Sequence, residues 1–305
     1  MQKKNNDLIS VIILTYNEEI HLKRCIESVT DISDQIIIVD SFSKDNTVNI
    51  SKNLGAVVYQ NPFVNQAKQF QWALDNVSIK NDWILRLDAD EYLTSDLTLE
   101  IKNKLPGTSD SITGIYFKRR VHFMGQWIKH GGYYPTYLLR LWRKGVGSIE
   151  QRWMDEHVIL NHGDTISMDH DFIDDNLNNM NWWIEKHNGY SLREAVEFLI
   201  YKYNFTTEIK TELNNSSQEG KKRKLKNNYY NRLPLFLRPF IYFFYRYILK
   251  LGFLDGKRGF IWHILQGFWY RFLVDTKIYQ IERISKESGL SIQEVLDRDF
   301  GIKIK

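Results

Sequence analysis

The chain has 305 residues, which is long for one compact core and favours one large domain with an appendage, or two domains. A hydrophobic content of 43% argues against wholesale disorder, and a net charge of +4 does not by itself indicate nucleic-acid binding. The single cysteine, Cys25, excludes an intramolecular disulfide and fits a reducing compartment. We expect it to be a small core residue on a helix.

The first hundred residues alternate between predicted strands and predicted helices. Apolar, β-branched segments predict strands at 8–16, 35–40, 56–60 and 83–90, and helical spacing predicts helices at 17–29, 46–55 and 65–77. Strands that are apolar on both faces and separated by helices indicate a parallel sheet covered on both sides. Ligands bind such sheets at the carboxyl ends of the strands. Three of these strands end in polar residues, at Thr15-Tyr16-Asn17, Asp40-Ser41 and Asp88-Ala89-Asp90.

The remainder of the chain changes character twice. Further strands are expected within 111–170 and a helix over 179–203, whereas 214–228 is polar and strongly basic and indicates a loop. Residues 232–275 mix dense aromatic and leucine side chains with recurring Arg and Lys, and no stretch of 18 charge-free apolar residues exists. This pattern favours an amphipathic arrangement on a membrane surface, with helices packed on the catalytic domain or at an oligomer interface as alternatives.

The segment WILRLDADEYL ends a strand in carboxylates. Because residues i and i+2 of an extended segment face the same side, Asp88 and Asp90 can present oxygens toward one point. Two nearby anions repel unless a cation joins them, and Mg²⁺ or Mn²⁺ prefers oxygen ligands that it shares with phosphates. The strand end is therefore a candidate metal and diphosphate site.

Three ordered motifs, VIILTYNEEIHLKRCIESV, IIIVDSFSKDNT and WILRLDADEYL, resemble the nucleotide-binding half of a family 2, GT-A-type glycosyltransferase over residues 8–170. RWMDEHVIL, WWIEKHNGYSLREA and GFLDGKRGF are similar to the branch that extends lipopolysaccharide core and related bacterial surface saccharides. The resemblance implies a GT-A domain over 1–205. We expect a basic linker over 206–231 and an amphipathic helical extension over 232–305.

The resemblance also implies roles for individual residues. Those expected to contact the nucleotide sugar are Thr15, Tyr16, Asn17, Glu18, Asp40, Asp88 and Asp90. Asp90 would be the main metal ligand and Asp88 would lie near the ribose and the metal. Many relatives carry a second aspartate after Asp40 that often contacts uracil; this chain has Ser41 there, which weakens the expectation for base recognition.

An inverting transfer also needs a base that removes the proton of the acceptor hydroxyl. The family places its base in the region of MDEHV, so Glu156 is the first candidate and Asp155 the second. Neighbouring side chains of an extended segment point to opposite faces, so only one of the two reaches the acceptor. His157 is either a third metal ligand or, more commonly for a neutral imidazole, a core or loop residue.

Several other polar or aromatic residues have two interpretations. Lys186, His187 and Arg193 either clamp a diphosphate or form a solvated helix face, and Arg140 either binds phosphate or makes a surface ion pair. The aromatic residues beside the glycine-rich HGGYYP loop either stack on a sugar or pack in the core; they are Trp127, Tyr133 and Tyr134.

The leading hypothesis is a Mn²⁺- or Mg²⁺-dependent inverting glycosyltransferase. It would move sugar from a UDP-sugar to a lipid-linked saccharide at the cytoplasmic membrane face, with residues 232–275 on the membrane. A sugar nucleotidyltransferase is disfavoured because LTYNEE stands where a glycine-rich phosphate loop is expected. A scaffold with a degenerate transferase domain is disfavoured by the intact carboxylates, and nucleic-acid binding by the lack of a recognised motif.

Overall fold

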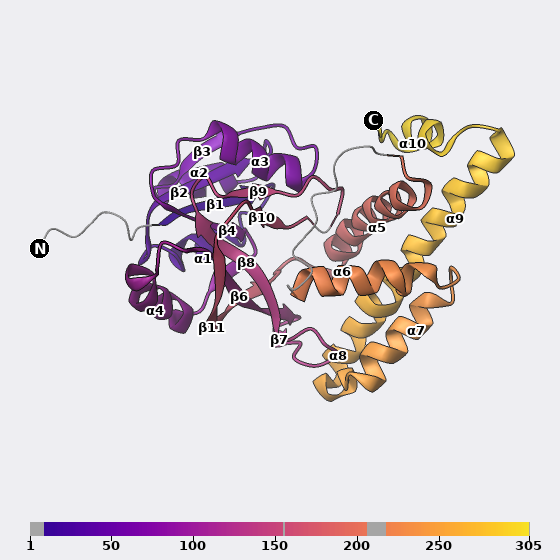
Figure 1. Ribbon diagram of the computed structural model, residues 1–305. Coiled ribbons are helices and arrows are strands. Elements are labelled where there is room, and N and C mark those ends of the chain that lie inside the picture. Colours follow the sequence, from indigo (N-terminus) through magenta and orange to yellow (C-terminus); the bar gives the residue numbers. More distant parts are fainter. Residues whose placement is uncertain (1–8, 155, 206–217, 305) are drawn as a thin grey trace, which may run out of the picture. The chain divides into compact units, whose positions relative to one another are not determined.

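The computed structural model describes residues 9–154, 156–205 and 218–304. The chain packs as two compact units (Figure 1). The first runs up to Lys129 and adds Tyr133–Gln151 and Glu156–Leu177, and the second holds the remaining described residues, chiefly those from Asn178 onward. The expected boundaries at 205 and 231 stay a prediction.

One nine-stranded sheet forms the centre of the first unit, with strands in the order β3-β2-β1-β4-β8-β6-β11-β5 and β7 paired to β6. The strands are β1 (Ile9–Thr15), β2 (Ser33–Asp40), β3 (Val57–Gln60), β4 (Trp83–Asp88), β5 (Glu91–Leu93), β6 (Ile112–Phe123), β7 (Gln126–Trp127), β8 (Thr136–Arg143) and β11 (Asp164–Asp175). A separate small sheet pairs β9 (Gly147–Ile149) with β10 (Val158–Leu160). The helices are α1 (Leu22–Glu27), α2 (Thr47–Asn53), α3 (Gln66–Asn76) and α4 (Ser95–Lys104).

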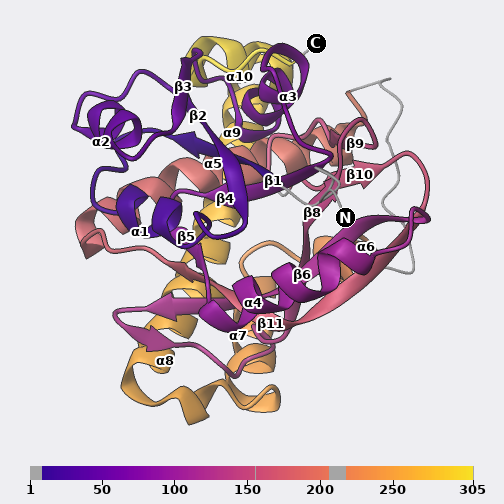
Figure 2. The same ribbon diagram turned by 90° about the vertical axis from the view of Figure 1, so that its left-hand side faces the viewer.

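The strands β3, β2, β1 and β4 run parallel, as the sequence predicts. Thr15 lies opposite Asp40 and Leu14 lies opposite Asp88, so β1, β2 and β4 end side by side. The three polar segments therefore share one edge of the sheet (Figure 2). Antiparallel pairs enter beyond β4, where β8 lies between β4 and β6. The predicted α/β class, a sheet flanked by helices and followed by a helical C-terminal region, is confirmed.

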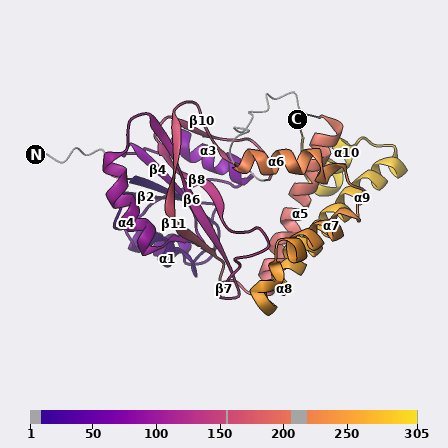
Figure 3. The same cartoon turned by 60° about the horizontal axis from the view of Figure 1, so that its bottom comes forward.

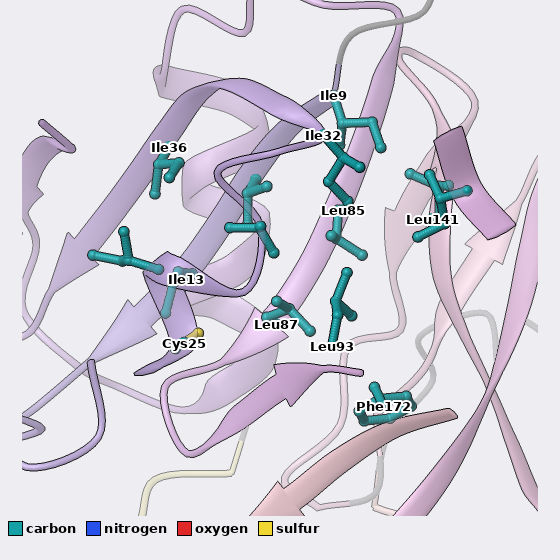
Figure 4. Packing of buried hydrophobic residues seen from close by; sticks show 14 of the residues in the cluster. Ile9, Ile13, Cys25, Ile32, Ile36, Leu85, Leu87, Leu93, Leu141 and Phe172 are labelled. Atoms are coloured by element: carbon teal, nitrogen blue, oxygen red, sulfur yellow. The ribbon is translucent and has the colours of Figure 1, made fainter. Parts of the chain in front are cut away.

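Each face of this sheet has its own apolar core because alternate strand residues point to opposite faces. Ile9 and Ile13 of β1 pack with Cys25 of α1 and with residues of α4 on one face (Figure 4). Ile12 and Leu14 pack with α3 on the other face. Cys25 is fully buried, as expected for a core residue. Burial of each large aliphatic side chain contributes roughly 1.5–3 kcal/mol, which fixes the strands whose ends carry the candidate site.

An irregularity in β11 is held by Glu100 of α4. The register of β11 on β6 shifts between residues 167 and 171, which interrupts the ladder. Glu100 accepts hydrogen bonds from the backbone N–H groups of Asp169 at 2.9 Å and His170 at 3.0 Å, and Lys104 Nζ lies 2.7 Å from it. Burial acts to raise the pKa of Glu100, but these hydrogen bonds outweigh it and lower the pKa to about 2.

The second unit is helical (Figure 3). Its core joins α5 and α9 with α10, through residues such as Leu199, Ile278 and Leu296. The α-helices are α5 (Met180–Tyr203), α6 (Gln218–Asn228), α7 (Arg238–Phe244), α8 (Gly256–Trp262), α9 (Tyr270–Ser288) and α10 (Ile292–Phe300). The shorter helical segments between them include the π-helices η4 (Tyr245–Leu249) and η6 (His263–Trp269) and the 3-10 helix η5 (Gly252–Asp255). Among the described helices none is both long and apolar enough to cross a bilayer.

Helix α6 corrects the expectation of an irregular loop at 214–228, since Gln218–Asn228 is helical. Its residues are mostly good helix formers, and Lys226 Nζ lies 2.7 Å from Glu194 of α5, which anchors the helix without an apolar stripe. The part of that segment before Gln218 lies outside the described residues.

Candidate active site

The ends of β1 and β2 are joined through Asp40. Thr15 Oγ1 donates to Asp40 Oδ1 at 3.0 Å, Ser43 N donates to Oδ2 at 2.9 Å, and the Ser43 hydroxyl donates to Oδ1. Gln60 Nε2 donates a fourth hydrogen bond at 3.2 Å. Asp40 is fully buried, and four donors occupy the lone-pair positions of its two oxygens. The carboxylate therefore orients Ser43 and the following loop; direct contact with a nucleotide base stays a prediction.

The loop after β1 is cross-linked to the loop after β2. Asn17 takes a left-handed conformation with φ of +56°, which asparagine tolerates better than most residues. Its backbone N–H donates to Ser43 Oγ at 2.8 Å, and its side-chain oxygen accepts from Lys44 N at 2.8 Å. The side chain of Tyr16 is left 53% exposed beside this junction. Thr15, Tyr16 and Asn17 thus form a rigid rim at the carboxyl ends of two parallel strands.

Glu18 is held by a buried histidine that the sequence did not single out. His21 is fully buried, its Nδ1 lies 2.6 Å from Glu18 Oε2, and its Nε2 accepts a hydrogen bond from Leu177 N at 2.8 Å. Because Nε2 is an acceptor, the proton of the neutral ring is on Nδ1 and is donated to Glu18. His21 therefore fixes one oxygen of Glu18 and ties it to the end of β11.

Asp88 lies at the end of β4 with its side chain 33% exposed. Gln66 Nε2 of α3 donates to Asp88 Oδ1 at 3.4 Å, and the backbone N–H of Asp88 donates to Glu91 Oε2 at 2.9 Å. Glu91 itself is buried and forms an ion pair with Arg140. Arg140 is thus a buried partner of Glu91, and not the surface ion pair that was one of its two interpretations.

Asp90 follows in the turn between β4 and β5, where the end of β11 fixes it. Asn176 Nδ2 donates to Asp90 Oδ2 at 2.9 Å, and Asp175 N donates to the Asp90 carbonyl at 3.1 Å. Arg24 of α1 pairs with Asp175 at 2.7 Å and donates to the Asp90 carbonyl at 3.4 Å. The predicted metal ligand is therefore positioned by residues more than 60 positions away in the sequence in both directions.

Glu156 comes to the same site through a buried arginine. Arg86 of β4 donates from Nη2 to Glu156 Oε1 at 2.9 Å, and its Nε lies 3.8 Å from Asp88 Oδ1. The side chains of Arg86 and Glu156 are only 8% and 11% exposed. The structure thus connects the first candidate base to Asp88, the residue predicted to lie near the ribose and the metal. Asp155, the second candidate, lies outside the described residues.

The site carries concentrated negative charge. Burial raises the pKa of Glu91, and the charges of Asp88 and Asp174 raise it further despite Arg140. Burial likewise raises the pKa of Asp174, with added contributions from Asp90 and Asp88. Both shifts show that the carboxylates of β4, the following turn and β11 act on one another at short range. Within the described ranges no three His, Cys, Asp or Glu side chains form a closed metal site.

Other residues noted in the sequence belong to local networks. His157 Nδ1 lies 3.8 Å from Glu150. Trp127 packs edge-on to Tyr134 at 4.9 Å, and Tyr134 donates to Asp171 at 3.0 Å. In the second unit His187 stacks on Trp183 at 3.6 Å and hydrogen-bonds its backbone carbonyl at 2.8 Å, so it is a packed residue of α5 and not part of a solvated face.

Sequence reasoning missed Arg86, Asn176, Arg24 and His21. Arg86 alone left a signal, since a charged residue inside the apolar strand WILRLD requires a buried acidic partner. Asn176, Arg24 and His21 act through contacts between distant segments, which no local pattern reveals.

Comparisons with known proteins agree with the sequence motifs. A protein of Rickettsia typhi named as an uncharacterized glycosyltransferase is 44% identical over 94 residues, covering 31% of this chain and 32% of the relative. LpsC of Rhizobium meliloti, named as a lipopolysaccharide core biosynthesis glycosyltransferase, is 34% identical over 150 residues, covering 46% of this chain and 52% of LpsC. The chain thus spans about a third of the length of the Rickettsia relatives it matches.

The crystal structure of S. aureus TarS is 15% identical, with a TM-score of 0.44 and 92% of each chain covered. The family description "Glycosyl transferase family 2" matches residues 10–176, which is more than half of the chain and contains every described candidate residue of the site. This chain therefore belongs to glycosyl transferase family 2.

Proposed function

We propose that this chain is an inverting glycosyltransferase that moves a sugar from a UDP-sugar to a hydroxyl group of a lipid-linked saccharide. The observation that carries the proposal is the chain of ion pairs from Asp88 through Arg86 to Glu156. It joins a carboxylate suited to the phosphate side of the donor with a carboxylate suited to act as base. Asp88 lies at the carboxyl end of the parallel strand β4, where ligands bind sheets of this kind, and Glu156 reaches it from the segment between β9 and β10.

The nucleotide is proposed to bind along the rim made by the loops after β1 and β2. The exposed ring of Tyr16 offers a stacking surface, and Asn17 is fixed by Ser43 and Lys44. Glu18 is fixed by His21, so its remaining oxygen has a defined direction. A preorganised rim of this kind binds a ligand at a small cost in conformational entropy.

The residues present fit a divalent cation. Asp88 and Asp90 supply carboxylate oxygens, which Mg²⁺ and Mn²⁺ prefer. Their charges contribute to raising the pKa of the neighbouring acids Glu91 and Asp174, as expected of a site that favours a cation. We propose that Asp90 and Asp88 hold the metal and that phosphate oxygens of the donor complete its ligands. When bound, the metal supplies positive charge beside the departing diphosphate.

Glu156 is proposed as the base, with Asp155 as the alternative. The acceptor oxygen forms a bond to the anomeric carbon while the bond from that carbon to the diphosphate oxygen breaks. The bonding pair leaves with the diphosphate, and the hydroxyl proton passes to the carboxylate. Arg86 holds Glu156 Oε1 in place, which restricts the rotamers of a side chain that must meet the acceptor in one orientation.

The acceptor and the compartment are further parts of the proposal. The similarity to LpsC supports a saccharide acceptor of the lipopolysaccharide core or a related surface glycan. We propose that the reaction takes place at the cytoplasmic face of the membrane, in keeping with a chain whose single cysteine forms no intramolecular disulfide.

Release of nucleoside diphosphate from UDP-, GDP- and dTDP-sugars, measured with and without Mn²⁺, tests this proposal. We expect UDP release from UDP-sugars that needs the metal and is lost in Asp90→Ala. Asp169→Ala is the matched control, because Asp169 belongs to another D-x-D sequence and its side chain is 79% exposed. Preference for a GDP- or dTDP-sugar would contradict the UDP assignment. Release of pyrophosphate from UTP and a sugar 1-phosphate, assayed separately, would indicate a nucleotidyltransferase, and absence of nucleotide binding would indicate a scaffold.

A further inference from the structure

The second unit exposes an unusual concentration of apolar side chains. Of the 26 large hydrophobic residues that are exposed in the described chain, 11 fall within residues 237–260. We call this segment the aromatic hairpin, because α7 and η4 lead into the short turn around η5 and α8 leads out of it. The 11 residues are Leu237, Phe240, Ile241, Phe244, Tyr245, Ile248, Leu249, Leu251, Phe253, Leu254 and Phe260. Contiguous exposure on this scale marks an interaction surface.

The aromatic hairpin is a built element. Phe240 of α7 packs on Phe268 of η6 with ring centroids 4.7 Å apart. This contact holds α7, the first arm of the hairpin, against η6, the helix that follows α8. In Figures 1 and 3, α8 lies at the end of the second unit opposite α10. The exposed side chains therefore project from a packed scaffold.

The turn of the hairpin is fixed from inside by a histidine and two glycines. A Cβ at Gly131 would lie 2.0 Å from Cε1 of His263, and a Cβ at Gly252 would lie 2.3 Å from its Nε2. His263 therefore fills the space that the two glycines leave. Gly131 N also donates to the Lys250 carbonyl at 2.9 Å. The side chains of Phe253 and Leu254 stand on this turn and are 43% and 55% exposed.

The exposed charges of the aromatic hairpin and its flanking residues are all positive. Residues 232–274 contain seven Arg or Lys and a single acid, Asp255. Asp255 is buried, accepts a hydrogen bond from His130 N at 2.8 Å, and lies 2.6 Å from His130 Nδ1. Lys250, Lys257 and Arg258 are exposed among the apolar residues. Through this stretch, all of which the structure describes, the surface therefore combines apolar side chains with cations and has no exposed carboxylate.

We propose that the aromatic hairpin inserts its apolar turn into the headgroup region of an anionic lipid surface, with Lys250, Lys257 and Arg258 contacting lipid phosphates. Apolar side chains gain from entering the acyl boundary, and each cation adds attraction to an anionic surface. A second copy of this chain fits less well, because two hairpins face to face would oppose cations with cations. The proposed insertion is interfacial, with the apolar turn at the headgroup and acyl boundary of one leaflet.

Vesicle binding tests the proposal independently of any transferase activity. Purified protein is floated with vesicles of phosphatidylglycerol and phosphatidylethanolamine, or with vesicles of phosphatidylcholine alone. We expect binding to the anionic vesicles that weakens as salt rises. Phe253→Ser with Leu254→Ser should weaken it by about tenfold or more. Lys257→Gln with Arg258→Gln should weaken it by about tenfold at low salt.

Leu99→Ser is the matched control, since Leu99 is 58% exposed on α4 in the first unit and should leave vesicle binding unchanged. Leu254→Cys gives a second measurement, because Cys25 is fully buried and an environment-sensitive dye will label the new thiol selectively. The dye should brighten with anionic vesicles at position 254 and stay unchanged in Leu99→Cys.

Equal vesicle binding by the Phe253, Leu254 double variant and the unaltered protein would overturn the proposal, as would the absence of binding to anionic vesicles. Concentration-dependent dimers that this double variant abolishes, without vesicle binding, would show that the hairpin is a protein interface. UDP binding measured on the same samples separates these outcomes from failure of the proposed transferase function.

Discussion

Arg86 and Glu156 form a buried ion pair, with Nη2 and Oε1 2.9 Å apart, that joins the centre of a strand to a segment 70 residues later. Arg86 Nε also lies 3.8 Å from Asp88. One arginine therefore spans the two carboxylates to which the proposed function assigns different tasks. This relationship makes the role of Glu156 testable separately from its contribution to folding.

Replacement of Glu156 by Gln should lower kcat by about 100-fold or more while the KM for the donor stays within a few-fold of its original value. The amide keeps the shape and one acceptor for Arg86 but removes the base. Steady-state rates of UDP release with a saturating acceptor measure this. Glu27→Gln is the control, because its side chain is 55% exposed on α1. Full activity in Glu156→Gln together with loss in Asp155→Asn would transfer the role to Asp155.

Replacement of Arg86 by Met should reduce the free energy of unfolding by about 3 kcal/mol, since it leaves a buried carboxylate without its partner. The double variant Arg86→Met with Glu156→Leu should recover part of that loss, because no orphaned charge remains at that pair. Urea denaturation of both single variants and the double variant gives the coupling energy. Strict additivity of the two changes would show that the ion pair contributes nothing to stability.

The parallel half of the fold was predictable because local patterns determine it. The apolar run expected at 8–16 became β1 over Ile9–Thr15, and the run expected at 83–90 became β4 over Trp83–Asp88. Strand β4 ends two residues before the predicted end because Asp88 N donates to the Glu91 carboxylate and begins a turn. A strand covered on both faces leaves a continuous apolar run in the sequence, whereas a turn made by one side chain leaves no such trace.

The candidate site was predictable only in part. The motifs placed Thr15, Asp40 and Asp88 at strand ends, and the structure brings these ends to one edge of the sheet. Asp90 is oriented by Asn176, 86 positions away, and Glu18 is oriented by His21, which in turn accepts from Leu177 N across 156 positions. Spacing alone does not encode these tertiary contacts. Helix α6 was missed because it lacks the apolar stripe by which a helix is recognised in a sequence. Intrinsic helix preference and one ion pair stabilise it instead.

Replacement of Asn176 by Ala should weaken the binding of UDP in the presence of Mn²⁺ by about tenfold, because the amide that orients Asp90 Oδ2 is lost. Calorimetric titration of UDP with and without the metal measures this effect. Binding of UDP without metal should change little. Asn53→Ala, at an exposed position of α2, is the control. Unchanged metal-dependent affinity in Asn176→Ala would show that Asp90 needs no such support.

Glu100 should make stability depend on pH in the acid range. Its pKa falls from a usual value of 4.5 to about 2 on folding, so its ionised form stabilises the native state above pH 4.5. That contribution is lost as the pH falls through the interval down to about 2, where the carboxyl is protonated in both states. Glu100→Gln removes the charge that accepts hydrogen bonds from Asp169 N and His170 N, so it should cost about 2 kcal/mol at pH 6.

Urea unfolding of the unaltered protein and of Glu100→Gln between pH 6 and pH 2.5 measures the difference directly. The gap between the two stabilities should narrow as the pH falls, because the unaltered protein progressively loses the same charge. Asp110→Asn is the control, since its side chain is fully exposed. A gap that stays constant over this range would mean that Glu100 stabilises the interrupted ladder of β11 through the shape of its side chain and not through its charge.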